Sequence, residues 1–351
     1  MQLGCGGRGM VHGRVTRATK DIELVALCDM DKPKLEKAAA DLGVKKTYTN
    51  FGEMLDKECY DLVDIITPPT IRVGIVEEAI AHGAKAILLE KPIALRPSEG
   101  RRLEELGKKT LIAINTQYQW MPHWQKFWKL LAVGKLGSIE TIRVSTLANI
   151  LEQGPHVLDL ALNAARISGL PWPETVLAAA SGLERFGKDP VPADVTAIAK
   201  LGDARLIFTH GESSVLVPNE KTYWYHIQVD IIGDRGRLWV SLNQGWKLWI
   251  CSSETKEGVP RRSEAKAGKF QSGPTGWPKN DSEAQTAMME CLRDTIRKGK
   301  EAEFPTRVEI ANKISDLFFA CYESALTNKT IPLPAQIDDG VVERLERLGK
   351  K

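Results

Sequence analysis

Three acid–base side chains stand close together near the middle of the sequence: Glu152, His156 and Asp159. Residues three apart share one face of a helix, so His156 and Asp159 point the same way if a helix begins near Pro155. Glu152, just before that helix, could fold over the same face. A histidine flanked by carboxylates can be oriented by them and can exchange a proton with a hydroxyl group. A lone histidine is more often a core residue, but two polar groups on an otherwise apolar helix favour a catalytic role.

A glycine-rich segment near the start of the sequence fits the G-x-G-x-x-G pattern of a dinucleotide-binding turn. Glycines allow the backbone to approach a pyrophosphate, which then lies on the N-terminus of the following helix. The predicted cofactor-binding residues of this segment are Gly4, Gly6, Gly7, Arg8 and Gly9. Asp29 ends the next predicted strand, 20 residues after Gly9 (29 − 9), where a carboxylate receives the ribose hydroxyls. The structural alternative for Asp29 is capping of a helix.

The carboxylate of Asp29 also bears on the choice of cofactor. A negative charge at this position would repel a 2′-phosphate, so NAD is favoured over NADP. Lys32 and Lys34 are close in sequence and keep NADP as the less favoured alternative.

A third segment, Glu90-Lys91-Pro92, follows an apolar run. A lysine at the carboxyl end of a buried parallel strand lies where ligands bind. Near a positively charged nicotinamide the pKa of this amine should fall, because like charges disfavour the protonated form. Lys91 could then exchange a proton with a substrate hydroxyl. A surface lysine paired with Glu90 is an alternative of similar weight.

The segments that must position these residues alternate between apolar strands and charged helices over residues 1–120. This pattern predicts an α/β domain with a doubly wound parallel sheet of the Rossmann type. Only three residues precede Gly4, so the first strand is either very short or begins farther upstream. The predicted strands are 22–28, 62–66, 84–89 and 111–114, and the predicted helices are 10–18, 31–42, 71–81 and 98–108.

After Pro122 the pattern changes to helices and to strand-like runs joined by turn pairs such as Gly202-Asp203 and Gly233-Asp234. It predicts an α+β domain over residues 121–351 with an open, mostly antiparallel sheet, whose C-terminal helices could pack back on the first domain. Residues 253–282 are rich in Gly, Pro and Ser and indicate a long loop. The predicted helices are 123–133, 157–167, 282–297 and 307–327, and the predicted strands are 139–147, 175–180, 195–201, 204–209, 226–232, 237–240 and 247–251.

Composition narrows the class of protein. A net charge of +3 over 351 residues lacks the concentrated basic face of a nucleic-acid-binding protein. No apolar run reaches the ~20 residues of a membrane helix. The six cysteines form no C-x-x-C pair, which favours a reduced, cytoplasmic protein. The six histidines are scattered, and no metal is expected.

These motifs, in this order, resemble those of the glucose–fructose oxidoreductase/inositol dehydrogenase/MocA family. The resemblance covers nearly the whole chain and also includes the segments Thr67–Pro69, Ile232–Gly236 and Ile331–Leu333. It implies two domains with the active site between them, and hydride transfer to or from C4 of the nicotinamide. It also implies oligomerisation through the C-terminal sheet, so a homodimer or homotetramer is expected.

The resemblance also implies roles for individual residues. Lys91 would contact both cofactor and substrate, and His156 would be the catalytic acid and base. Asp159 would hold the substrate or the histidine. The remaining implied residues line or support the cofactor site: Thr67, Pro68 and Glu90.

The sequence departs from the family pattern at two site positions. Glu152 stands where an aspartate is usual, so the carboxylate is kept but its reach differs. Gln119 aligns with an arginine of many members, and its neutral amide suggests an uncharged substrate. Gln117 and Trp120 are further candidate substrate contacts.

Aromatic residues around this position have two interpretations. Trp120, Trp124 and Trp128 have helical spacing, which favours core packing, although Trp120 could stack on a sugar ring. The segment 261–280, with Phe270 and Trp277, could cover the substrate or reach a neighbouring subunit.

Together these observations predict an NAD-dependent oxidoreductase that transfers hydride between nicotinamide and a ring hydroxyl of a neutral sugar, glycoside or cyclitol. The alternative is a redox-neutral, glycoside-processing enzyme that holds NAD tightly, oxidises a sugar transiently and returns the hydride after elimination. A non-catalytic binding protein is disfavoured, because unused buried polar groups would only cost stability.

Overall fold

The structure is a computed structural model that describes residues 1–251, 269–277, 279–299 and 303–349. The chain divides into two compact units, Met1–Gln117 with Ser282–Ser315, and Tyr118–Asp281 with Asp316–Lys351. Each unit is described by itself.

The first unit contains the predicted parallel sheet, with six strands in the order β3-β2-β1-β4-β5-β6. Its strands are β1 (Gln2–Leu3), β2 (Ala26–Cys28), β3 (Lys46–Tyr48), β4 (Leu62–Ile65), β5 (Ala86–Leu89) and β6 (Leu111–Ile114). The two-residue β1 lies in the middle, where Gln2 pairs with Leu27 of β2 and with Asp64 of β4. The strand predicted over 22–28 begins only at Ala26, and β3 was not predicted.

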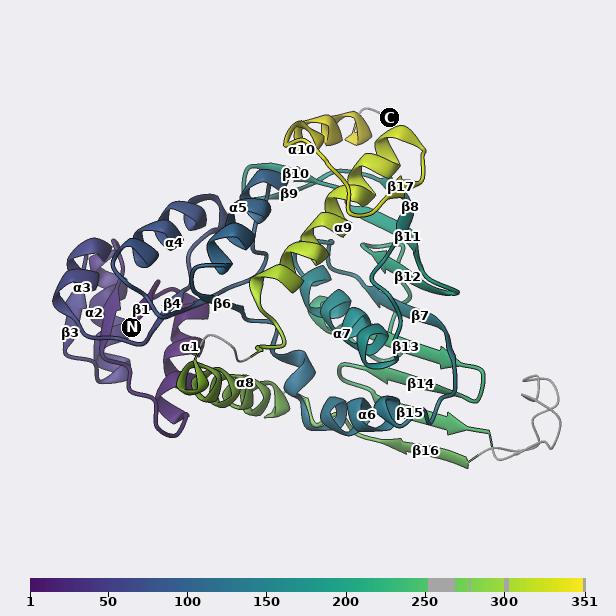
Figure 1. Cartoon of the computed structure of the whole chain (residues 1–351), viewed down its shortest axis with the longest axis horizontal. Coiled ribbons are helices and arrows are strands. Elements are labelled where there is room, and N and C mark those ends of the chain that lie inside the picture. The colour runs from purple at the N-terminus through teal and green to yellow at the C-terminus, as the bar shows by residue number, and fades with distance from the viewer. Residues whose placement is uncertain (252–268, 278, 300–302, 350–351) are drawn as a thin grey trace. The chain divides into compact units, whose positions relative to one another are not determined.

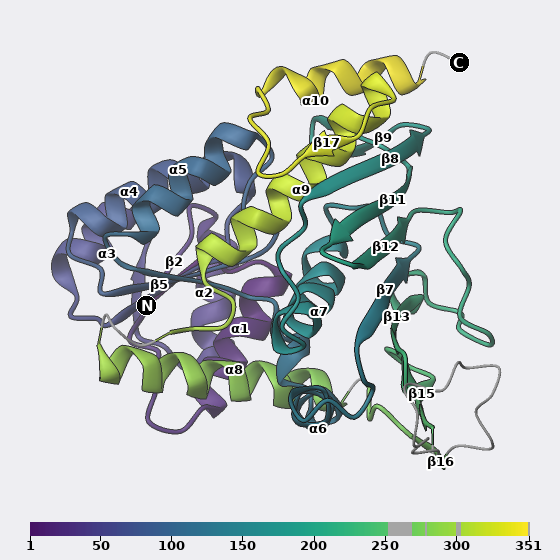
Figure 2. The ribbon, with the colours of Figure 1, turned by 45° about the vertical axis from the view of Figure 1, so that its right-hand side comes forward.

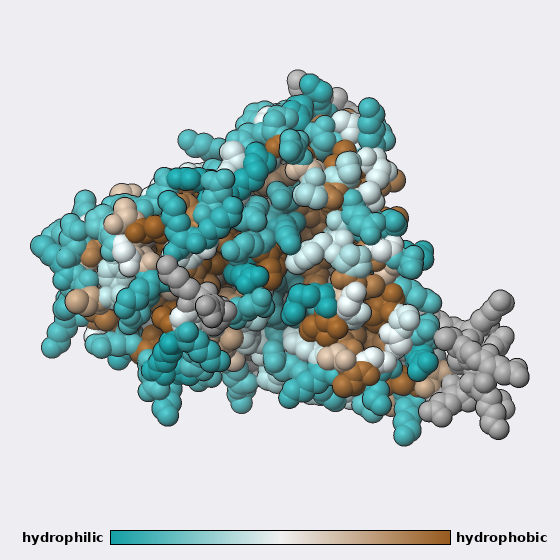
Figure 3. Space-filling model, viewed as in Figure 1, coloured by the Kyte–Doolittle hydropathy of each residue, from teal (hydrophilic) through white to brown (hydrophobic). Residues whose placement is uncertain are grey.

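Helices cover both faces of this sheet (Figure 1). They are α1 (Gly7–Ala18), α2 (Lys32–Leu42), α3 (Phe51–Lys57), α4 (Arg72–Ala81), α5 (Pro97–Gly107) and α8 (Lys279–Lys298), of which the part from Ser282 belongs to this unit. The apolar face of α2 packs on Leu27, whereas α3, α4 and α5 pack on the larger core of the opposite face. On the face seen in Figure 3, α3, α4 and α5 present mostly hydrophilic side chains, as expected of amphipathic helices.

Asp31, rather than Asp29, is the N-cap of α2, because its Oδ1 accepts a hydrogen bond from Lys34 N at 3.1 Å. Gly43 ends the helix in the left-handed region at φ 62°. The capping alternative for Asp29 is therefore wrong.

The second unit contains a nine-stranded sheet in the order β16-β15-β14-β13-β7-β12-β11-β8-β17. All its pairings are antiparallel except that of β7 with β12, so the predicted open, mostly antiparallel sheet is confirmed. Its strands are β7 (Ile139–Thr146), β8 (Thr175–Ser181), β11 (Asp194–Leu201), β12 (Ala204–His210), β13 (Ile227–Gly233), β14 (Gly236–Ser241), β15 (Gly245–Ile250), β16 (Lys269–Gly273) and β17 (Ile331–Pro332). A separate hairpin joins β9 (Glu184–Phe186) to β10 (Asp189–Val191).

One face of this sheet carries α7 (Gly154–Ile167), which packs on β7 and β13, with α6 (Pro122–Ala132) against α7 (Figure 2). The helix α9 (Val308–Thr327) enters the unit at Asp316, and α10 (Gly340–Arg344) lies against β10. The loop predicted over 253–282 is wrong in part, because Lys269–Gly273 forms β16 and α8 begins at Lys279. Within the described residues, no helix combines the length and the apolar character needed to cross a bilayer.

Candidate active site

The glycine-rich turn between β1 and α1 depends on close backbone approaches. Gly4 has φ 104°, and a Cβ there would lie 2.4 Å from Ile66 O. A Cβ at Gly9 would lie 2.2 Å from Gly4 O, so the turn can close only without side chains at these two positions.

The N-terminus of α1 fits the pyrophosphate of a dinucleotide. Gly6 is the N-cap, and no side chain caps the helix. Cβ atoms built at Gly6 or Gly7 would meet nothing within 4 Å. The start of α1 is therefore uncrowded at these two glycines, and its first N–H groups have no partner within the helix, which suits an anion bound by backbone N–H groups and the helix dipole.

Asp29 follows β2 and stands beside this turn. Its Oδ2 accepts a hydrogen bond from Cys5 N at 2.7 Å, and its Oδ1 accepts one from Asp31 N at 2.9 Å. A carboxylate oxygen accepts more than one bond, so lone pairs remain for ribose hydroxyls. Lys34 is paired with Asp31 at 2.6 Å. The arrangement therefore favours a ribose diol over a 2′-phosphate.

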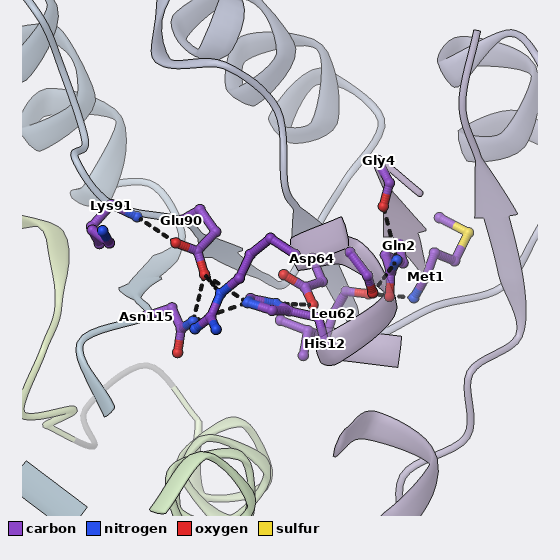
Figure 4. A network of polar contacts seen from close by, with 11 residues as sticks. Met1, Gln2, Gly4, His12, Leu62, Asp64, Glu90, Lys91 and Asn115 are labelled. Carbon is purple, nitrogen blue, oxygen red and sulfur yellow. Dashed lines mark hydrogen bonds and ion pairs between the residues drawn. The ribbon is translucent and has the colours of Figure 1, made fainter. Parts of the chain in front are cut away.

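Glu90, directly after β5, is the centre of a buried polar network (Figure 4). Its Oε1 lies 2.8 Å from Arg8 Nε, 2.7 Å from His12 Nε2 and 2.6 Å from Asn115 Nδ2. Its Oε2 accepts a hydrogen bond from Lys91 N at 3.2 Å. Glu90 thus links the glycine-rich segment to the backbone of the lysine predicted to act on substrate.

His12 extends the network to β4, because its Nδ1 lies 2.9 Å from Asp64 Oδ2. Burial lowers the pKa of His12, but Asp64 and Glu90 outweigh this and raise it to about 9. For Glu90 the effects are reversed in sign. Burial raises the pKa of this carboxyl, but the positive charges of His12, Arg8 and Lys91 hold it well below its usual range. At neutral pH an imidazolium therefore donates to both carboxylates.

Buried hydrogen bonds from Arg72 hold the predicted Thr67-Pro68 segment in place. Arg72, at the start of α4, is 1% exposed and donates to Thr67 O at 2.6 Å and to Pro92 O. One guanidinium thus joins the loop after β4 to the loop that follows Lys91.

The sequence did not single out Arg72, His12, Asp64 or Asn115 as site residues. The only available signal was the place of His12, three residues after Gly9, and of Asp64 inside an apolar strand. Neither signal specifies which partners the side chain will meet.

In the second unit, α7 begins at Gly154, with Pro155 in its first turn, as predicted. His156 and Asp159 are both buried, at 4% and 3% exposure. The ring of Tyr118 stacks on His156 with centroids 4.3 Å apart and planes 19° apart. Gln119 Nε2 donates to Asp159 Oδ2 at 2.6 Å. The structure therefore brings Gln119 to Asp159 and fixes one face of the histidine ring.

The other predicted substrate and acid–base residues lie nearby in the sequence. Glu152 is half-buried in the turn before α7, where its backbone N donates to Asn149 Oδ1 at 3.2 Å. Trp120 is half-buried. Trp124 and Trp128 stack on each other with centroids 4.8 Å apart, and both are buried, so their predicted core role is confirmed. Gln117, the last residue of the first unit before the chain enters the second, is 2% exposed.

The segment predicted to cover the substrate divides in two. Residues 261–268 lie outside the described part of the chain. Phe270 lies on β16 and is 63% exposed. Trp277 packs edge-on against Tyr118 at 6.0 Å and Tyr225 at 5.3 Å. The described part of the segment thus places Trp277, but not Phe270, beside the ring that covers His156.

Residues 3–115 match the model of an oxidoreductase family with an NAD-binding Rossmann fold. The chain is similar to D-apiose dehydrogenase of Paraburkholderia graminis, with 32% identity over 41% of this chain and 38% of that protein. It therefore aligns with well under half the length of that relative. It is also similar to myo-inositol 2-dehydrogenase of Thermotoga maritima, with 23% identity over 67% of this chain and 73% of that protein.

Solved structures share the fold over nearly the whole chain. Levoglucosan dehydrogenase, in complex with NADH and L-sorbose, superposes with a TM-score of 0.77 at 15% identity, covering 95% of this chain and 98% of that one. At this identity the likeness concerns the fold alone.

Proposed function

We propose that this chain is a member of the glucose–fructose oxidoreductase/inositol dehydrogenase/MocA family and a dehydrogenase of a neutral polyol ring. Residues 3–115 match an NAD-binding oxidoreductase family, and similar proteins include sugar and inositol dehydrogenases. The reaction transfers hydride between nicotinamide and a ring hydroxyl of a sugar, glycoside or cyclitol. The names of two relatives, an apiose dehydrogenase and an inositol dehydrogenase, support this substrate class.

The observation that carries the proposal is the pair formed by Gln119 and Asp159. Here a buried carboxylate accepts a hydrogen bond from a neutral amide at 2.6 Å, whereas a guanidinium at the amide's position would attract an anionic substrate. Carboxylate and amide groups such as these exchange hydrogen bonds with sugar hydroxyls. A substrate rich in hydroxyl groups and without a carboxylate fits these groups best.

We assign complementary roles to the acid–base residues. Bound NAD supplies the acceptor for the hydride of a carbinol C–H. Either Lys91 or His156 takes the proton of the substrate hydroxyl, while Asp159 orients the substrate. Tyr118, stacked on His156, restricts rotation of the imidazole, and Glu152 adds negative charge near the start of α7.

The test mixes purified protein with NAD and a panel of neutral sugars, glycosides and cyclitols, and follows the absorbance of reduced nicotinamide. We expect turnover of at least one panel member and none of sugar acids. Lys91→Met and His156→Ala should each lower kcat by about 10²-fold or more, the usual weight of a positioned proton-transfer group. His82→Ala, in an exposed ion pair with Asp56, is the matched control and should leave kcat unchanged.

Two outcomes would contradict the proposal. Full activity of Lys91→Met would remove this residue from the reaction. Silence across the panel, with NAD that survives extensive dialysis, would instead favour redox-neutral processing of a glycoside.

We further propose that the protein forms a homodimer or homotetramer through the second unit's sheet. Among the described residues, no α-helix lies on the face opposite α7 (Figure 2). An apolar patch lies on this face, where Leu177 is opposite Ile198 and Ile198 is opposite Ile207. Leu177 and Ile198 are 49% and 51% exposed, an arrangement that favours burial against a second copy.

Light scattering after gel filtration tests the assembly. Ile198→Glu should shift the mass to that of a monomer. Val133→Glu, at a residue that is 69% exposed at the end of α6, should leave it unchanged. A monomeric wild-type protein would overturn this proposal without affecting the proposed reaction.

We also propose a cytoplasmic location. None of the six cysteines, all of them described residues, forms a disulfide, as expected in a reducing compartment. Cell fractionation tests this, and recovery from an extracellular fraction would contradict it.

A further inference from the structure

His12 occupies a position that no part of the proposed reaction uses. It lies in α1, three residues after Gly9, and is 1% exposed. Figure 4 shows its ring between Asp64 and Glu90, with both ring nitrogens engaged. A fully buried cation between two buried carboxylates is costly to remove, because the anions would then face each other without compensation.

The three residues come from three different elements near the carboxyl ends of the parallel strands. His12 belongs to the helix that starts at the glycine-rich turn, Asp64 to β4, and Glu90 to the end of β5. Glu90 in turn accepts from the backbone N of Lys91 and from Arg8 of the glycine-rich segment. The His12 ring thus contacts the carboxylates of both Asp64 and Glu90.

We propose that His12 is a positioning residue, which fixes the Glu90 carboxylate between α1 and β4 and so aligns Lys91 with the glycine-rich turn that binds the cofactor. It touches neither substrate nor nicotinamide and acts through Glu90. The effect on turnover rests on the proposed role of Lys91, whereas the effect on cofactor binding does not.

The test is a double-mutant cycle with His12→Gln, Glu90→Gln and the combined variant. The first readout is the dissociation constant of NADH, measured by fluorescence titration without any sugar. The second is the split between kcat and the KM of the sugar substrate. If His12 acts through Glu90, the combined variant should bind NADH no more weakly than the weaker-binding single variant, because all three variants lose the same His12–Glu90 contact. We expect His12→Gln to lower kcat by about tenfold and to change the KM of the sugar less than threefold.

Val15→Ala is the matched control for stability. Val15 lies on the same helix, is buried and belongs to neither the network nor the glycine-rich turn. It should lower Tm while leaving kcat and the NADH dissociation constant unchanged.

Distinct results would overturn this inference and the proposed function. Multiplicative losses in the NADH cycle, or NADH binding and kcat of His12→Gln within twofold of wild type, would show that His12 does not act through Glu90. A wild-type protein that oxidises no sugar would contradict the proposed function, while the NADH cycle would still decide the role of His12.

Discussion

Replacement of Arg72 by methionine tests the idea that one buried guanidinium holds two cofactor loops in place. Methionine keeps the length and apolar contacts of the side chain but leaves the carbonyl oxygens of Thr67 and Pro92 without their donor. A hydrogen bond from a charged group contributes about 1.5–3 kcal/mol. Two such bonds give about 3–6 kcal/mol, and the lower desolvation cost of methionine offsets part of this.

We therefore expect Arg72→Met to destabilise the protein by about 3 kcal/mol, which lowers Tm by roughly 6–12 °C for a unit of this size. Burial lowers the pKa of Arg72 to about 10, although Glu90 and Glu99 oppose the shift, so the residue is charged in any neutral buffer. Differential scanning calorimetry measures Tm, and fluorescence titration measures the affinity for NADH, which should fall as well.

Arg102→Met is the control, because Arg102 lies on the next helix and its side chain is 46% exposed, paired with Glu77 and Glu105. Exposed ion pairs contribute about 0–1 kcal/mol, so its Tm should stay within a few degrees of wild type. Equal Tm values for the two variants would refute the reasoning that burial and the two carbonyl contacts make Arg72 different.

Three further predictions concern the first unit. The pKa of His12 is raised from 6.5 to about 9 in the folded state, so its contribution of about 3 kcal/mol should be complete below pH 6.5 and lost as the pH rises through 9. Urea unfolding of wild type and His12→Gln should accordingly show a gap that narrows between pH 7 and 9.5, and a constant gap would contradict the assignment. Asp29→Asn should weaken NAD binding about tenfold and bring the affinities for NAD and NADP closer together, as fluorescence titration of both can show; an unchanged ratio would remove Asp29 from cofactor selection. Gly9→Ala should abolish NAD binding and lower Tm, because its Cβ would lie 2.2 Å from Gly4 O, whereas Gly74→Ala meets nothing within 4 Å and should stabilise α4 by up to about 1 kcal/mol.

Buried strands were predictable from the sequence because their burial leaves a strong apolar signal. The strands β4, β5 and β6 were predicted to within two residues at each end. The strands β3 and β16 were missed although β6, which also lies at a sheet edge, was found. The difference is burial, because Lys46 and Thr47 of β3 are exposed, whereas β6 is mostly buried. Lys269 and Gln271 are exposed in β16, so its sequence carries polar residues in place of a buried face.

The candidate site residues also fall into those that a local sequence pattern predicts and those that it does not. Motifs whose members lie within a few residues, such as the glycine-rich turn, were visible as spacing. The contacts of His12 with Asp64 and of Asn115 with Glu90 span 52 and 25 residues. Their register depends on the order of strands in the sheet, which no local pattern specifies. The sequence therefore indicated candidate cofactor residues in the glycine-rich turn, but not the contacts of His12 and Asn115 behind it.

The first unit is discontinuous, and this bears on the order in which the chain can fold. Its sheet ends at β6, where Ile114 N donates to Thr306 O and Ile114 O accepts from the Thr306 hydroxyl. Arg293 of α8 likewise donates to Lys20 O. During synthesis the glycine-rich turn emerges first. The segment with Arg293 and Thr306, which completes the same unit, emerges only after the other unit's strands β7 to β16 have been made. A fragment ending at residue 120 would leave β6 without its contacts to Thr306. The unit whose synthesis begins first can therefore complete its fold only late in synthesis.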